Sequence, residues 1–456
     1  MAQQTTFEQD LFRGSVIRPG DSEYENARAV YNAIHDRRPA LIVQALGVED
    51  VRAAIRVARD HDLPLAVRGG GHSVAGFGTC DDGIVLDLGP MRQIIVDPER
   101  RRVRAEGGCT WADLNDATHA FGLATTGGVV STTGIGGLTL GGGFGYLARR
   151  CGLACDNLVS AELVTADGDV LTCSEDENKD LFWALRGGGG NFGVVTSFEY
   201  RLHPVGDVVG GPTVYRLEGN VLRGFDELIA RAPEEFGALL GLALAPPFPF
   251  VPQEWHLRPV AVVISCWTGA REDADEALRP LGELGAVLGQ SIGPMPYPVI
   301  NTLFDELLPK GLRHYWKSEF TTDIAEDAVD LHLGHAARVP TLESGTFFFP
   351  LDGACHRVGA DETAFAFRDA RFGAGVFGTW DEPADDEPNI TWVRDYHEAV
   401  RPFSLGAGYV NFASADEQGS APQVYRQNHE RLAQVKHRHD PENLFRLNQN
   451  VAPAAS

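Results

Sequence analysis

The stretch Arg68-Gly69-Gly70-Gly71-His72-Ser73 decides how the N-terminal part of this sequence is interpreted. It follows residues 63–67, an apolar run typical of a short buried strand. Because glycine has no Cβ, the backbone N–H groups of such a loop can approach an anion closely. A second loop of this kind, Gly141-Gly142-Gly143-Phe144-Gly145, lies further along the chain. Together the two loops predict a cradle for the pyrophosphate of a dinucleotide.

A third glycine pattern, Gly188-x-Gly190-x-x-Gly193, formally matches the Rossmann dinucleotide fingerprint. That fingerprint requires a strand before the glycines and a helix after them. Here the helix-like segment 180–185 comes first and the strand-like segment 194–198 follows. The context therefore argues against a Rossmann site.

Helix-like and strand-like segments alternate over the first two hundred residues or so. Residues 50–61 and 111–120 predict helices, and residues 83–88, 103–105 and 158–165 predict strands. After residues 203–205 the glycine clusters end, and a strand over 260–267 and a helical stretch over 271–284 are expected. The C-terminal part predicts one helix over 423–439 and an extended tail over 444–451. Since 456 residues exceed what one core usually serves, we expect two domains with a boundary near residue 205.

Composition excludes several classes of protein. Hydrophobic residues make up 43% and charged residues 22%, which is typical of a globular protein and not of a disordered one. The formal net charge is -24 and lysines are rare, so nucleic acid is a poor candidate partner. Residues 1–6 show no basic segment leading into an apolar one, and no apolar run is long enough to span a membrane. We therefore expect a soluble, cytoplasmic chain without a membrane partner.

Metal binding is not expected. The 7 cysteines are scattered, as buried thiols in a reducing compartment would be. Cys151 and Cys155 have a metal-like spacing, but no second Cys/His pair lies nearby. The acidic run 381–387 lacks the spacing of a calcium loop and is predicted to be a surface loop.

Several longer motifs resemble the berberine-bridge-enzyme-like FAD-linked oxidases of the vanillyl-alcohol-oxidase superfamily. The motifs that carry the resemblance are 68–73, 133–137 running into 141–145, 189–196, Tyr409-Val410-Asn411 and 443–449. They span nearly the whole chain. The resemblance implies an α+β, two-domain fold of the PCMH-type FAD-binding class, whose substrate domain is an antiparallel sheet covered by helices. Residues 1–205 would form the FAD-binding domain, 206–405 the substrate-binding domain, and 406–456 a segment that returns to the FAD-binding domain.

The same resemblance implies that FAD is covalently bonded to His72. In many relatives a cysteine forms a second bond to FAD, but Val130 occupies that position here. We therefore expect a single bond, as in bacterial relatives similar to 6-hydroxynicotine oxidase. A neutral imidazole nitrogen can add to the 8α carbon, and the bond favours reduction of the flavin by substrate. The alternative is a loop histidine that makes ordinary hydrogen bonds.

Tyr409 is the candidate catalytic base, and Asn411 is expected on the same strand face to orient flavin or substrate. A phenol whose pKa is lowered by a neighbouring cation or by the flavin could accept the substrate's proton. A half-buried packing tyrosine is the alternative.

The resemblance also implies which residues contact FAD. They are Arg68, Gly69, Gly70, Gly71, His72, Ser73, Gly76, Val130, Thr133, Gly134, Gly136, Gly137, Leu138, Gly141, Gly142, Gly143, Gly145, Asn157, Gly193, Val194, Val195, Tyr409, Asn411, Asn448 and Asn450.

Signals for the substrate site are weaker. Trp267, Tyr315, Trp316 and 347–349 could line an apolar pocket beside the flavin, although aromatic strand residues more often belong to a core. Lys317 could bind an anionic or carbonyl group, or be an ordinary solvated lysine.

Three functions follow as hypotheses. The first is an oxidase that takes a hydride from an alcohol, sugar or amine-bearing small molecule to flavin N5 and passes the electrons to O2, giving H2O2. The second is a flavin-dependent oxygenase or oxidative rearrangement enzyme of secondary, polyketide-type metabolism, because 68–73, Thr133, Leu138 and 409–412 also resemble the oxygenase of enterocin biosynthesis. The third is a non-catalytic flavin carrier. Either a monomer or a homodimer is compatible with the sequence.

Overall fold

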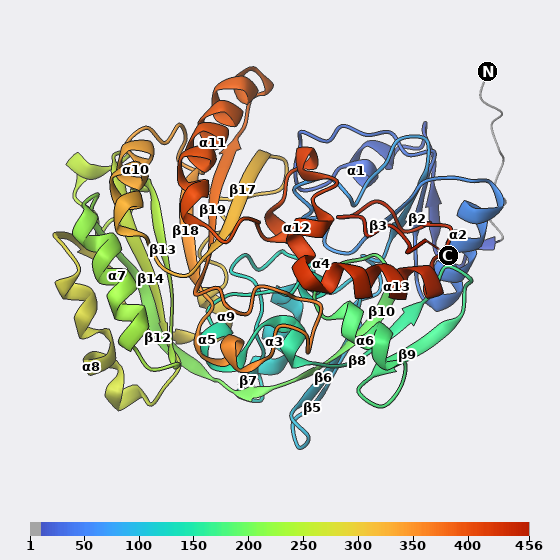
Figure 1. Ribbon diagram of the computed structural model, residues 1–456, viewed down its shortest axis with the longest axis horizontal. Coiled ribbons are helices and arrows are strands. Elements are labelled where there is room, and N and C mark those ends of the chain that lie inside the picture. The colour runs from blue at the N-terminus through green and yellow to red at the C-terminus, as the bar shows by residue number, and fades with distance from the viewer. Residues whose placement is uncertain (1–10, 456) are drawn as a thin grey trace.

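The computed structural model describes residues 11–455 and combines helices with largely antiparallel sheets (Figure 1). The predicted α+β class is confirmed. Among the described helices, none has the length and apolar character needed to cross a membrane. Residues 1–6, which entered the prediction of a cytoplasmic chain, lie outside the described residues.

The first sheet is mixed, since β1 pairs antiparallel with β2 and the other strand pairs are parallel. Its strand order is β1-β2-β4-β3, with β1 (Ser15–Ile17), β2 (Leu41–Gln44), β3 (Leu65–Arg68) and β4 (Ile84–Asp87). β2 and β3 both pair in parallel with β4, and helix α2 (Val48–Asp60) connects β2 to β3. The glycine loop 68–73 leaves this sheet at the end of β3.

The second sheet is antiparallel, with the order β5-β6-β10-β8-β9. Its strands are β5 (Ile94–Asp97), β6 (Arg102–Glu106), β8 (Leu158–Val164), β9 (Val170–Ser174) and β10 (Val194–Arg201). Helix α6 (Lys179–Leu185) precedes Gly188 to Gly193, and β10 follows them. This order confirms that the glycine fingerprint has the wrong context for a Rossmann site. A small ribbon pairs β7 (Leu123–Ala124) with β11 (His203–Pro204).

The large sheet is antiparallel and has the order β15-β12-β14-β13-β18-β19-β17, with β16 also pairing with β12. Its strands are β12 (Asp207–Arg216), β13 (Phe236–Leu244), β14 (Pro259–Trp267), β15 (Val287–Gln290), β16 (Gly293–Pro296), β17 (Arg313–Thr321), β18 (Gly345–Pro350) and β19 (Phe372–Trp380). Helices α7 (Gly219–Arg231), α8 (Ala274–Leu278), α10 (Glu326–Ala336) and α11 (Asp386–Val400) lie on its outer side in Figure 1. The boundaries proposed at residues 205 and 405 stay a prediction.

Successive side chains of β18 point alternately into two hydrophobic cores, one on each face of the large sheet. Phe348 packs in the cluster under α7 and α10, whereas Phe347 and Phe349 face the opposite cluster, which contains Tyr409. This inner face, turned towards the glycine loops, carries the functional site.

The remaining helices are short, apart from the last. They are α1 (Tyr24–Arg28), α3 (Trp111–His119), α4 (Ile135–Leu140), α5 (Ala148–Cys151), α9 (Tyr297–Ile300), α12 (Ala421–Tyr425) and α13 (His429–His439). The helix α13 packs against α6 and so returns the C-terminal part to the N-terminal half (Figure 1).

Three local predictions need correction. The helix expected over 423–439 is broken, because Arg426 has a positive φ of 45°. The stretch 271–284 combines α8 with two turns of 3-10 helix, the second of which has a proline at its start. Tyr409 and Asn411 do not share a strand, since residues 410–412 form a 3-10 turn. The tail 444–451, predicted to be extended, contains neither a helix nor a regular strand.

Candidate functional site

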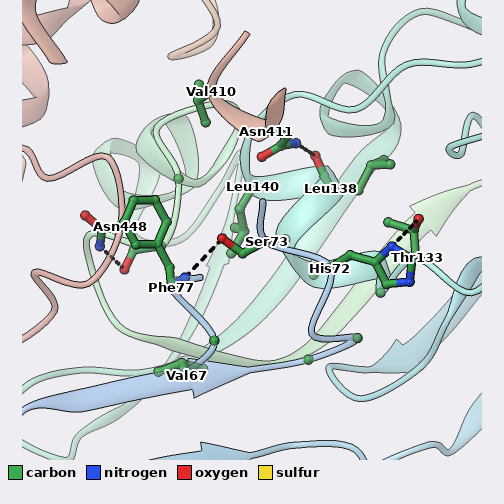
Figure 2. Close-up of a pocket in the computed structure, with 18 of the residues that line it drawn as sticks. Val67, His72, Ser73, Phe77, Thr133, Leu138, Leu140, Val410, Asn411 and Asn448 are labelled. Atoms are coloured by element: carbon green, nitrogen blue, oxygen red, sulfur yellow. Dashed lines mark hydrogen bonds between the residues drawn. The ribbon is translucent and has the colours of Figure 1, made fainter. Parts of the chain in front are cut away.

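A cavity of about 310 Å³ lies between the loop that follows β3, the start of α4, and the inner face of the large sheet (Figure 2). Its two glycine-rich walls are pressed together. A Cβ built on Gly70 would lie 2.6 Å from Cα of Gly134, so neither position has room for a side chain. Gly71 has a φ of +71°, which L side chains rarely adopt. These constraints explain why the loop consists of glycine.

The loop offers unpaired donors to the cavity. Within residues 11–455, the backbone N–H groups of residues 69–73 have no hydrogen-bond acceptor. Successive free N–H groups form a nest that binds anions. The loop is held in place by Ser73, whose Oγ accepts the N–H of Phe77 at 3.1 Å, and by Arg68, which pairs with Asp87 at 2.9 Å. A pyrophosphate therefore fits this wall.

The far end of the cavity also carries unsatisfied polar atoms. Gln449 is 3% exposed, and neither of its side-chain polar atoms has a partner within the described chain. Oδ1 of Asn448 is likewise buried and unpartnered among residues 11–455. Buried polar atoms are normally hydrogen-bonded. These atoms suit the heteroatoms of a bound cofactor such as FAD.

Most residues predicted from sequence do line the cavity. They are Arg68, Gly69, Gly70, Gly71, His72, Ser73, Val130, Thr133, Gly134, Gly136, Gly137, Leu138, Gly193, Val195, Tyr409, Asn411 and Asn448. Residues from both halves of the chain and from its end thus meet at one place.

Other residues predicted to contact FAD do not line this cavity, and their contact with FAD stays a prediction. They are Gly76, Gly141, Gly142, Gly143, Gly145, Asn157, Val194 and Asn450. Nδ2 of Asn157 donates to the backbone of Cys151 at 2.9 Å, and Val194 is fully buried in a core. Gly143 acts indirectly, since its N–H donates to Oη of Tyr409 at 2.9 Å.

Sequence reasoning missed several lining residues. Among them are Tyr31, Phe144, Phe412, Tyr425, Phe445 and Gln449. Phe144, Phe412, Phe445 and Gln449 lie inside or beside the motifs already recognised, so their neighbours were a usable signal. No sequence signal pointed to Tyr31, because it lies in an irregular segment between α1 and β2.

His72 is held by hydrogen bonds from both ring nitrogens. Nε2 lies 3.0 Å from Oγ1 of Thr132, and Nδ1 lies 3.4 Å from Oγ1 of Thr133 (Figure 2). Burial, with a smaller contribution from the positive charge of Lys310, lowers the pKa of His72 to about 4. The imidazole is therefore neutral at neutral pH and keeps a nucleophilic lone pair.

Tyr409 and Asn411 are brought together although they share no strand. Nδ2 of Asn411 donates to Oη of Tyr409 at 2.7 Å and to O of Leu138 at 3.1 Å. Burial raises the pKa of Tyr409 well above its ordinary value, despite the hydrogen bonds from Gly143 and Asn411 that favour the phenolate. The protein by itself does not lower this pKa, so its phenol is neutral, and a lowering by bound flavin stays a prediction.

Aromatic rings form the wall of the cavity beside Tyr409. Phe412 contacts the rings of Phe377 at 5.0 Å, Trp316 at 5.8 Å and Phe349 at 5.9 Å between centroids. Trp316 and Phe349 line the cavity, as the sequence suggested.

Other candidates for this wall lie elsewhere. Trp267 and Phe348 belong to the core on the outer face of the large sheet, and Tyr315 packs in a further cluster. Lys317 is 9% exposed and pairs with Asp416 at 2.9 Å, so it is not an ordinary solvated lysine and its charge is already paired. Alternation along β17 places Tyr315 and Lys317 on the face opposite to Trp316.

No group of three or more metal-ligating side chains occurs within residues 11–455. Burial raises the pKa of Cys151 to about 12, which keeps this thiol protonated. The acidic run 381–387 is mostly exposed, and its end forms the first turn of α11, where Asp386 pairs with Arg313 at 2.5 Å.

Comparison with family models gives two matches. Residues 39–174 match the model of an FAD binding domain, and residues 408–452 match the model described as berberine and berberine like. The two matches contain the glycine loops and the Tyr409-Val410-Asn411 motif, respectively.

Similar proteins cover nearly the whole chain. An FAD-linked oxidoreductase of Dictyostelium discoideum is 32% identical over 97% of this chain and 96% of its own length. The (R)-6-hydroxynicotine oxidase of Paenarthrobacter nicotinovorans is also 32% identical, over 97% of this chain and 98% of its own. The crystal structure of 6-hydroxy-D-nicotine oxidase from Arthrobacter nicotinovorans superposes with a TM-score of 0.87 and 29% identity, covering 97% of this chain and 98% of that one.

Proposed function

The chain belongs to the berberine-bridge-enzyme-like FAD-linked oxidoreductases, and from this premise we propose that it holds FAD by a single covalent bond to His72. We propose further that it oxidises an alcohol, sugar or amine-bearing small molecule, with O2 as electron acceptor and H2O2 as product. The observation that carries the proposal is that His72, the free backbone N–H groups of residues 69–73 and the aromatic wall all line one cavity.

Residues 69–73 and 134–137 would hold the pyrophosphate, and Asn448 and Gln449 would bind polar atoms of the cofactor. The unpaired backbone N–H groups of residues 69–73, and the unpartnered side-chain atoms Oδ1 of Asn448 and Nε2 and Oε1 of Gln449, support the assignment. Val130 lines the cavity and has no nucleophilic atom, which supports a single bond. When bound, FAD supplies the electron acceptor, taking a hydride from the substrate at N5 and later giving its electrons to O2.

Tyr409 and Asn411 are the proposed catalytic residues. Oη of Tyr409 accepts hydrogen bonds from Gly143 and Asn411, so its own proton is free to point towards the substrate. We propose that the neutral phenol binds the substrate's oxygen or nitrogen and so orients the reacting carbon. Asn411 fixes the phenol, because its Nδ2 is also anchored to the backbone of Leu138.

The aromatic wall favours a substrate with a flat apolar ring. Trp316, Phe349 and Phe412 offer ring faces and edges to the cavity, and such surfaces stack with other aromatic rings. Arg68 is the charged lining residue on this cavity and is already paired with Asp87. A relative named for 6-hydroxynicotine, an amine-bearing heteroaromatic compound, agrees with this preference.

Two coarser assignments complete the proposal. The division into 1–205, 206–405 and 406–456 is supported by the large sheet, whose strands run from Asp207 to Trp380. A cytoplasmic location is supported by the cysteines, which are free and buried among the described residues.

Anaerobic reduction tests the function. Aromatic amines and aromatic alcohols are added to the purified yellow protein, with xylose oligomers as the sugar comparison. We expect an aromatic compound to bleach the flavin and air to restore the colour with one H2O2 formed per flavin. Reduction by none of the three classes would contradict the oxidase proposal. The flavin is also reoxidised with isotopically labelled O2. Incorporation of the label into the organic product would favour an oxygenase instead.

A further inference from the structure

His72 is the first ring in a stack of three, followed by Tyr31 and His314. The ring of Tyr31 lies 4.0 Å from that of His72 at an interplanar angle of 17°, and 4.5 Å from that of His314 at 11°. His314 in turn meets Trp316 edge-on at 5.4 Å. Tyr31 is 4% exposed and His314 is 1% exposed. The stack therefore runs from the proposed attachment residue into the aromatic wall.

Tyr31 is held from both sides although it lies in neither a helix nor a strand. Its N–H donates to O of Gly71 at 3.1 Å, and its backbone O accepts the N–H of Gly311 at 3.1 Å. The phenol donates to O of Leu308 at 3.2 Å. These bonds tie Tyr31 to the glycine loop and to the segment before β17.

The next residue repeats this bridging. Nδ2 of Asn32 donates to O of Val74 at 2.7 Å and to O of His314 at 2.8 Å. Oδ1 of Asn32 accepts the N–H of His314 at 2.9 Å. The segment that carries Tyr31 is thus a rigid link between the loop of His72 and strand β17.

We propose that Tyr31, stacked between His72 and His314, is a positioning residue that fixes the plane of the His72 imidazole for its bond to FAD. The inference rests on the proposed attachment at His72. It adds a requirement for two residues that have no bond to FAD themselves.

The chemistry explains why the ring plane matters. One imidazole nitrogen bonds to the 8α methyl carbon, which gives up a hydrogen with its bonding electron pair. The other imidazole nitrogen gives up its proton, and O2 takes up both as H2O2. The lone pair of the attacking nitrogen must point at the carbon throughout.

The surroundings indicate which nitrogen attacks. Thr133, the partner of Nδ1, lines the FAD cavity, whereas Thr132, the partner of Nε2, lines a second cavity of about 640 Å³. Nδ1 therefore faces the cavity proposed for FAD and would be the attacking nitrogen. The torsion that turns a histidine ring has a broad energy minimum. The stack therefore restrains rotations of the His72 ring that the hydrogen bonds to the two threonines leave free.

The inference is tested by measuring the rate at which FAD becomes covalently attached to the protein. Protein from riboflavin-starved cells is mixed with FAD in air, and acid-precipitated samples are assayed for in-gel fluorescence and intact mass. The variants are Tyr31→Leu and His314→Leu, which remove a ring, and Tyr31→Phe, which keeps it. Tyr396→Leu is the matched control, because it removes a stack with His335, at 4.7 Å and 11°, in another cluster.

We expect Tyr31→Leu and His314→Leu to slow attachment by about ten-fold or more relative to the control, with each variant assayed at saturating FAD. Tyr31→Phe should attach FAD at the wild-type rate. Attachment by both leucine variants at the wild-type rate would overturn the inference. It would also be overturned if Tyr31→Phe attached FAD as slowly as Tyr31→Leu. If Tyr31→Leu does not fold, His314→Leu decides. A wild-type protein that never acquires covalent FAD would instead overturn the attachment itself, and the inference with it.

Discussion

Nζ of Lys436 lies 2.6 Å from Oδ2 of Asp440, and both side chains are fully buried. Nζ also donates to the backbone O of Asn191 and of Phe445. Asp440 accepts the N–H groups of Leu444 and Phe445. The pair therefore fastens the end of α13 to the tail that carries Gln449 into the cavity.

Removing the lysine should unfold this junction. We expect Lys436→Met to lower the free energy of unfolding by about 3–5 kcal/mol, because it leaves the carboxylate of Asp440 buried without its cation. Denaturant titration measures the loss. Lys179→Met, at an exposed position, is the control and should change the free energy by less than about 0.5 kcal/mol. Equal stability of the two variants would contradict this account of the pair.

The contact of the glycine loop 68–73 with Gly134, at the start of α4, predicts a second effect. A Cβ in Gly70→Ala would push against Gly134 and force the loops apart. We expect a loss of about 1–3 kcal/mol in unfolding free energy and protein that retains little FAD. Gly282→Ala is the control, since its Cβ would meet no atom within 4 Å. Full FAD content in Gly70→Ala, measured by absorbance, would show that the loops tolerate separation.

Tyr409→Phe removes the oxygen that Gly143 and Asn411 hold in place. We expect anaerobic flavin reduction to slow on the order of 10²-fold, because the substrate's polar group loses its partner. Covalent FAD should remain at the wild-type level, since His72 is untouched. Stopped-flow absorbance with a bleaching substrate gives the rate. An unchanged rate would remove Tyr409 from the mechanism.

The pH dependence of attachment tests the state of His72. Burial and the charge of Lys310 lower its pKa to about 4, so the reactive neutral form is present above that value and lost below it. The rings stacked beside it stay neutral, because burial raises the pKa of Tyr31 and lowers that of His314 to about 3. We therefore expect a nearly constant attachment rate from about pH 5.5 to 8. A rise of the attachment rate with pH, with its midpoint near the ordinary histidine pKa of about 6.5, would contradict this expectation.

Much of the fold follows from local sequence. The apolar periodicity of 50–61 and the runs at 63–67 and 83–88 predict α2, β3 and β4 because these elements bury contiguous side chains, whereas β2 was not predicted. The segments flanking Gly188 likewise predict α6 and β10. The break at Arg426 was missed, since a single positive φ leaves no mark on the periodicity of a helix.

The site was predicted less completely. The residues of the glycine loops could be named because closely packed backbones leave no room for side chains, and Gly70 with Gly134 shows this. Tyr31 could not, because its partner His314 lies on a strand far along the chain and the intervening segment has no periodicity. The raised pKa of Tyr409 depends on burial by distant segments, which no motif records.

The most direct test of the central claim is the intact mass of the purified protein after acid precipitation, beside that of His72→Ala. The account predicts a yellow wild-type pellet with the added mass of one FAD, and a His72→Ala pellet that is colourless at its unmodified mass. A wild-type protein at its unmodified mass after growth with ample riboflavin, or a covalent adduct that persists in His72→Ala, would contradict it.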